Sequence, residues 1–168
     1  MISSFYFPHG TLTDIVDINN KDLLISIESL EDQDHIVSMC CNPIKDGKGV
    51  TYEYDKLFIN KINKLDDNGE NNTTKFYKLV YGFGDGFPKH TMIIPEFVRL
   101  YTRINKVFLA PSVIRKTDVM VDYGERDIKI YEVEQCEKPY SDFVYKLSLS
   151  NSSDKWINFY YNGLLAAI

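Results

Sequence analysis

The chain has 168 residues, of which 44% are hydrophobic and 14% are aromatic. This apolar material is enough for one packed core, so we expect a single domain over residues 1–168 and exclude global disorder. Asp and Glu number 24 against 19 Lys and Arg, and the net charge of −5 disfavours a general nucleic-acid binder, because a negative surface repels phosphate.

The chain shows no sign of export or membrane insertion. The N-terminus lacks a basic region, and its apolar run is broken at Pro8, too early for a signal peptide. No stretch approaches the roughly 18 apolar residues that a membrane-spanning helix needs. The three cysteines, Cys40, Cys41 and Cys136, are an odd number with an adjacent pair, which is not typical of a disulfide framework. We therefore expect a cytoplasmic protein with reduced, buried thiols, without membrane or cofactor.

Composition and periodicity both favour β-structure. Ala occurs only at positions 110, 166 and 167, whereas Ile, Tyr, Phe and Val are abundant. Apolar and polar residues alternate in several segments, as in strands that bury one face. Turn-forming residues separate the segments that we predict to be strands: 23–28, 36–41, 50–55, 76–82, 107–110, 119–123, 127–133, 143–150 and 156–161.

These runs, about ten in number, predict a mainly β fold, an antiparallel sandwich or barrel. Two segments differ from the rest. Residues 60–75 are almost entirely polar and are predicted to form a long loop. Residues 95–105 are predicted to form one short amphipathic helix, because Pro95 precedes four apolar residues at helical spacing. These four are Phe97, Leu100, Tyr101 and Ile104.

The glycine-rich segment 82–90 holds the catalytic candidates. Asp85 and His90 are residue types that supply a general base and the group that orients it. The segment lacks the residue order of a phosphate-binding loop or a dinucleotide fingerprint. The alternative, a connection with a tight turn at Asp85 and Gly86, stays open.

Other chemistries have weaker support in the sequence. The three histidines, His9, His35 and His90, lack the spacing of metal ligands, so we expect no metal site. Glu132 and Glu134 have the residue types of a glycosidase pair, but any acidic β protein supplies such pairs.

The negative charge is concentrated in one segment. Seven acidic and two basic residues lie from Asp118 to Glu137, so this segment carries a net charge of −5, equal to that of the whole chain. Strands 119–123 and 127–133 are expected to pair as a hairpin that gathers these carboxylates. Alternation places Asp118 and Asp122 toward solvent, whereas Glu132 shares the parity of buried positions, which predicts a bulge or the end of the strand.

A second acidic patch covers residues 28–34, which include no basic residue. Both patches are open to two interpretations. They are a solvated face that keeps the protein soluble, or they are a docking surface that raises the rate and specificity of association with a basic partner. Under the second interpretation the partner-binding residues are Asp118, Asp122, Glu125, Asp127, Glu132, Glu134, Glu28, Glu31, Asp32 and Asp34.

With this charge profile, the chain resembles small acidic immunity proteins of bacterial contact-dependent growth inhibition systems. The matching features are the two acidic patches and the lack of a catalytic motif, and no residue role is carried over. The resemblance implies a non-catalytic inhibitor that binds a cognate toxin, often a basic nuclease, and occludes its active site. Two alternatives stay open: a small β-barrel enzyme that uses Asp85 and His90, and a ligand-binding or structural β-sandwich module.

Overall fold

The computed structural model describes residues 2–14, 24–30, 34–46, 49–66, 74–136, 143–151 and 158–168. The strands within these ranges are β1 Ile2–Pro8, β2 Leu12–Thr13, β3 Ile25–Ser26, β4 Asp34–Asp46, β5 Gly49–Asp66, β6 Phe76–Gly82, β7 His90–Pro95, β8 Arg99–Thr102, β9 Val107–Leu109, β10 Val119–Val121, β11 Asp127–Cys136, β12 Phe143–Asn151, β13 Asn158–Tyr161 and β14 Leu164–Ala167. The helical elements of the same ranges are two short 3-10 helices, η2 Ile27–Leu30 and η3 Pro111–Val113.

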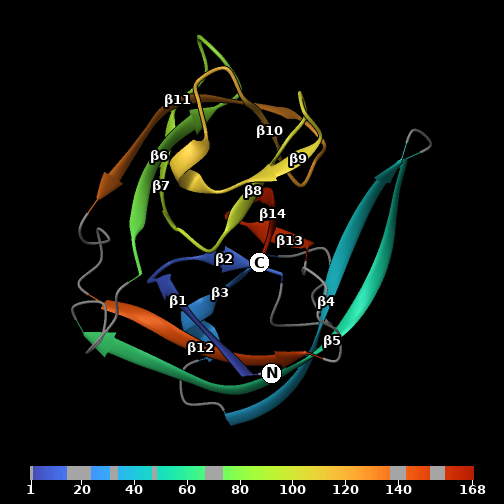
Figure 1. The fold of residues 1–168 in the computed structure, drawn as a ribbon, viewed down its shortest axis with the longest axis vertical. Coiled ribbons are helices and arrows are strands. Elements are labelled where there is room, and N and C mark those ends of the chain that lie inside the picture. Colours follow the sequence, from blue (N-terminus) through green and yellow to red (C-terminus); the bar gives the residue numbers. More distant parts are fainter. Residues whose placement is uncertain are drawn as a thin grey trace.

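The strands form two antiparallel sheets. The larger, of ten strands, runs in the order β3-β2-β13-β14-β8-β10-β11-β6-β7, and β9 pairs with β8. The smaller, of four strands, runs β1-β12-β5-β4. In Figure 1 the larger sheet curves around the upper part of the molecule, the smaller one crosses below it, and β4 and β5 form a long hairpin that projects to one side. This arrangement confirms the predicted antiparallel, mainly β fold.

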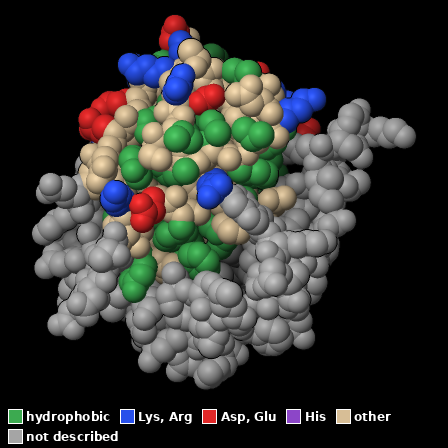
Figure 2. All heavy atoms as spheres, viewed as in Figure 1, with side chains coloured by type: hydrophobic (Ala, Val, Ile, Leu, Met, Phe, Trp, Pro, Cys, Tyr) green, Lys and Arg blue, Asp and Glu red, His purple; other side chains and the backbone are tan. Residues whose placement is uncertain are grey.

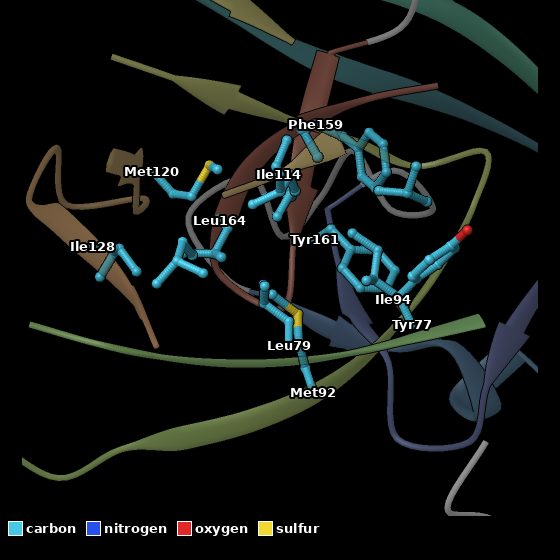
Figure 3. Close-up of a cluster of buried hydrophobic side chains, with 14 of the residues drawn as sticks. Tyr77, Leu79, Met92, Ile94, Ile114, Met120, Ile128, Phe159, Tyr161 and Leu164 are labelled. Atoms are coloured by element: carbon cyan, nitrogen blue, oxygen red, sulfur yellow. The ribbon is translucent and has the colours of Figure 1, made fainter. Parts of the chain in front are cut away.

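The core lies inside the curved sheet. Figure 3 shows side chains from distant strands pointing toward one another, among them Leu79, Ile94 and Phe159, none of which is exposed. Phe7 of β1 is fully buried in the same cluster, so the end of β1 joins the smaller sheet to the larger one. Each such side chain contributes roughly 1.5–3 kcal/mol through burial.

The strands with regular short-range signals were predicted well. The run 76–82 coincides with β6. The acidic hairpin is confirmed by the pairing of β10 with β11, in which Val121 lies opposite Asp127. The expected irregularity near Glu132 is also confirmed, because the register of β11 against β6 shifts between Ile130 and Glu132.

The predicted helix over 95–105 is wrong. A turn at 96–97 is followed by β8 and by a second turn over 103–106, and the structure describes no α-helix in this region. Val98, Leu100 and Thr102 are fully buried, which is a strand period of two, whereas Ile104 of the helical pattern is 59% exposed. Of the four residues at helical spacing, only Leu100 is also a fully buried strand position, and β8 is fixed by its neighbours β14 and β10.

Two further predictions had wrong boundaries. The segment 23–28 contributes only the two residues of β3 before η2 begins. The predicted loop 60–75 is strand as far as Asp66, because β12 pairs with β5 to that point. Residues 67–73 lie outside the described ranges. The part of the chain that the structure describes contains no helix long and apolar enough to cross a membrane.

The Thr102 hydroxyl is a buried polar group without a hydrogen-bond partner in the structure. We expect Thr102→Val to raise the free energy of unfolding by about 1 kcal/mol, because valine has the same shape and no polar group to desolvate. Thr11→Val is the matched control: this hydroxyl is also buried but donates to the Pro8 carbonyl at 2.7 Å, so its loss should destabilise. Urea unfolding measures both; equal effects would contradict the argument.

Candidate functional site

A cavity of about 320 Å³ lies between the β1–β2 connection and strand β7. Residues 8–12 form one wall, residues 91–93 form another, and Tyr81 and Asn162 complete the lining. The lining therefore comes from four places in the chain that are far apart in sequence. In Figure 1, β2 and the end of β1 lie beside β6 and β7.

A tight turn shapes the first wall. Gly10 has a φ of 84°, a left-handed conformation that glycine adopts without strain. The backbone N–H and the hydroxyl of Thr11 both donate to the carbonyl oxygen of Pro8, at 3.2 and 2.7 Å. The carbonyl of Thr11 accepts from Ile27 at 2.9 Å, so this turn is fixed from both sides.

Glu28 supports the same turn. One of its carboxylate oxygens accepts from the backbone N–H of Gly10 at 3.1 Å, and the other lies 3.6 Å from Nε2 of His9. Sequence reasoning placed Glu28 in a partner-binding patch. The structure places it against the cavity wall, where it orients the imidazole of His9.

Asn162 connects the C-terminal hairpin to the cavity. It occupies the β13–β14 turn with Gly163, at φ values of 47° and 87°. Its Oδ1 accepts from the N–H of Leu12 at 2.7 Å, and its own N–H donates to the Leu12 carbonyl at 2.8 Å. Its Nδ2 contacts the sulfur of Met92 at 3.6 Å.

Two buried ionisable groups lie next to this region. Tyr161 is fully buried and donates its hydroxyl to the carbonyl of Ile93 at 2.7 Å, and burial raises the pKa of its phenol. Burial also raises the pKa of Asp14 to about 6, although its carboxylate accepts from the N–H of Tyr160 at 2.8 Å. Sequence reasoning missed both, because no local pattern marks them.

A second cavity of about 170 Å³ shares Tyr81 and Asn162 with the first. Aromatic groups line much of it, and the Arg126 guanidinium lies 4.3 Å from the centroid of the Phe83 ring. Asp122 is at its wall and holds the same guanidinium.

The expectation that Asp118 and Asp122 face solvent is wrong. Asp118 is 9% exposed and Asp122 is 4% exposed. Asp118 accepts from the N–H of Arg115 at 2.7 Å. Asp122 accepts from the N–H groups of Gly124 and Arg126 and from the Arg126 guanidinium, at 2.8 to 3.0 Å. Both carboxylates close turns, a local role that strand alternation does not reveal.

The exposed members of the acidic cluster lie next to basic groups. Asp127 pairs with Arg103 at 2.7 Å, and Lys78 lies 3.9 Å from Glu132 and 3.6 Å from Glu134. The backbone carbonyl of Glu125 accepts from Arg103. Figure 2 shows acidic and basic side chains next to each other on the described face. Binding of a basic partner by these carboxylates stays a prediction. Glu31 and Asp32, and the side chain of Asp34, lie outside the described residues.

The structure does not join Asp85 to His90. Asp85 forms the predicted tight turn with Gly86 and contacts Lys129 and Tyr131, each at 3.3 Å; Lys129 lowers the pKa of its carboxyl group. His90 lies against the ring of Tyr81 at 5.7 Å. No hydrogen bond or ion pair links the two among the contacts of the described residues.

The described residues provide no candidate site for metal binding or thiol chemistry. These contain no group of three potential metal ligands, and the side chains of His35, Cys40 and Cys41 are not among the described ones. Cys136 is a partly buried free thiol, and burial raises its pKa.

Solved structures similar to this chain are inteins or intein-like domains. An intein-like domain from Clostridium thermocellum has a TM-score of 0.54 at 16% identity, over 97% of this chain and 98% of that one. An intein from a hyperthermophile has a TM-score of 0.51 at 13% identity, over 99% and 100%. A mutant of an Ssp DnaB mini-intein variant has a TM-score of 0.50 at 12% identity, over 98% and 92%. No protein-family model and no curated protein matches the chain.

This likeness corrects the resemblance to immunity proteins. The chain has an intein-like fold over nearly its whole length, so the prediction of a non-catalytic toxin inhibitor is contradicted, as is the prediction that the protein is not an enzyme. The error has a physical reason. Net charge and its distribution govern solubility and association but do not specify a fold.

Proposed function

We propose that the chain is a self-processing domain, which acts on a peptide bond of the polypeptide that carries it. The observation that carries this proposal is the likeness to three inteins or intein-like domains over 97–99% of the chain. Inteins catalyse their own splicing. At identities of 12–16% the likeness concerns the fold, so the activity of this chain has to be tested directly.

Groups around the larger cavity support the proposal. Cleavage of a peptide bond by acyl transfer needs a nucleophile, a base and donors for the carbonyl oxygen. Thr11 supplies a hydroxyl and an N–H that converge on one carbonyl oxygen, that of Pro8 in the same turn, and both would leave Pro8 to bind the carbonyl oxygen of a substrate. His9 has a carboxylate partner in Glu28 at 3.6 Å, an arrangement that suits general-base catalysis.

In such a reaction the oxygen of a hydroxyl, or the sulfur of a thiol, bonds to the carbonyl carbon. The C–N bond breaks, and the proton of the nucleophile passes to the leaving nitrogen. The ester or thioester formed is then hydrolysed by water or attacked by a second nucleophile of the same polypeptide. His9 and Thr11 are the described residues that we assign to proton transfer and to stabilising the carbonyl oxygen.

The test places the full chain between two folded reporter domains and follows the fusion by electrophoresis and intact-mass measurement. We expect fragments that account for the mass of the precursor, or joined reporters, and faster cleavage with hydroxylamine, which attacks esters and thioesters. Thr11→Val and His9→Gln should each slow the reaction by roughly a hundredfold. A precursor that stays as intact as a urea-unfolded sample, with and without hydroxylamine, would falsify the proposal.

A further inference from the structure

Strand β7 has one edge that the described strands leave open. It pairs with β6 along its whole length, from His90 opposite Tyr81 to Pro95 opposite Phe76. It is the last strand in the order of the ten-stranded sheet, and no described strand pairs with its second edge. Unpaired backbone groups at such an edge are a template for another strand.

The direction of each backbone group on β7 follows from three observations. The N–H of Glu96 donates to the carbonyl of Lys75 at 2.9 Å, so the backbone groups of Glu96 point toward β6. The residue before it, Pro95, has no N–H to donate. The carbonyl of Ile93 accepts from the Tyr161 hydroxyl, outside the β6–β7 pair. In an antiparallel strand the backbone N–H and C=O groups of successive residues point alternately to the two sides, so those of Ile93 and Thr91 point away from β6.

These groups open onto the larger cavity. Thr91 is exposed, and residues 91–93 line the cavity of about 320 Å³. The carbonyl of Ile93 is already bound by Tyr161. Thr91 and Ile93, whose remaining backbone groups point away from β6, therefore line a space large enough to hold a side chain.

The lining of the cavity favours an apolar occupant. The Thr11 hydroxyl already donates to Pro8, and the amide of Asn162 is bonded to Leu12 and in contact with Met92. A polar side chain that entered would find these groups engaged and would lose hydrogen bonds to water. The side chain of Leu12 is 39% exposed and offers apolar contact.

We infer that the open edge of β7 at Thr91 binds an extended polypeptide segment as an added strand, with one apolar side chain of the segment in the cavity. An extended backbone matches the alternating N–H and C=O groups of a sheet edge, whereas other ligands do not. The occupant is the segment on which the proposed processing acts, since the edge adjoins His9 and Thr11 across the same cavity. In this respect the inference rests on the proposed function.

The test uses the full chain, labelled with nitrogen-15, and two blocked synthetic peptides. The first has the sequence Thr-Val-Phe-Val-Thr, which is uncharged and favours strand. The second has the same side chains, but its central backbone nitrogens are methylated and cannot donate. We expect the first peptide to shift the amide resonances of Thr91 and Ile93 saturably, and the second to bind at least tenfold more weakly.

Two protein variants make the test specific to the edge. Thr91→Pro removes the N–H that points away from β6 and leaves the bonds to β6 in place, as is usual for proline on an edge strand. It should weaken binding of the first peptide by roughly tenfold, whereas the matched Thr91→Val should bind within about twofold of the parent. If Thr91→Pro does not fold, the methylated peptide makes the same comparison.

The outcomes separate the two proposals. Equal binding of both peptides, saturable shifts confined to other strands, or no saturable shift would each overturn strand addition at β7, even if the reporter fusion is cleaved. Binding at Thr91 with an intact fusion would support strand addition and overturn the processing proposal alone.

Discussion

Asp122→Ala is expected to lower the free energy of unfolding by about 3 kcal/mol. The carboxylate is almost completely buried and accepts from the N–H groups of Gly124 and Arg126 and from the Arg126 guanidinium. Alanine would leave these donors without their acceptor. The change would also release the guanidinium that lies over Phe83, so the β10–β11 hairpin would lose its tie to the segment between β6 and β7.

Asp127→Ala is the matched control in the same hairpin. Asp127 is exposed and forms one surface ion pair, with Arg103 at 2.7 Å, so its loss should cost well under 1 kcal/mol. Asp122→Asn keeps an oxygen for the two N–H groups and removes the charge, and should fall between the two. Urea unfolding with an unchanged denaturant slope measures all three. Equal stabilities for Asp122→Ala and Asp127→Ala would show that Asp122 is a solvated charge, as the sequence pattern indicated.

Asp122 and Asp127 show that the charge pattern of a sequence does not distinguish a buried carboxylate from an exposed one. Both belong to the segment that carries the net charge of the chain, and the sequence does not distinguish them. Their roles differ because one carboxylate turns back onto the turn that follows it and the other extends to Arg103, in the turn after β8. Such side-chain to backbone bonds depend on the turn conformation, here a φ of 64° at Glu125.

Strands with one buried face could be predicted from the sequence, and fully buried ones could not. The β10–β11 hairpin alternates and has a turn signal. β14 is buried at all four positions, Leu164–Ala167, so it shows no alternation. The segment of β8 was mistaken for a helix because its apolar residues have helical spacing, and only its place between β14 and β10 makes it a strand.

The candidate site could not be predicted from the sequence, for a related reason. Its walls meet through contacts such as the bond from Leu12 to Asn162, which joins residues 150 positions apart. The sequence holds turn-forming residues in two of these walls, Gly10 in one and Asn162 with Gly163 in another. That these turns face the same cavity follows from the order of strands, which no short-range pattern specifies.

Asp14 should make the protein less stable as the pH rises through the weakly acidic range. Its pKa is about 6 in the folded state against 3.8 as the ordinary value. Between these values the folded state binds more protons than the unfolded state, so the free energy of unfolding falls as the pH increases and stays low above pH 6. Asp14→Asn removes the carboxyl group that binds this proton. It should match the parent near pH 4 and exceed its stability at pH 8 by up to about 3 kcal/mol.

Asp85→Asn provides a control of opposite sign. Lys129 lowers the pKa of Asp85, so the parent gains stability from this exposed carboxylate above its ordinary pKa and loses that contribution as the pH falls. The parent should therefore exceed Asp85→Asn at pH 8 and approach it in acid. Urea unfolding of the three proteins from pH 4 to pH 8 yields both differences. If the difference for Asp14→Asn does not grow with pH, the Asp14 carboxyl group is solvated in the native protein, and β13 is not held by a buried charge.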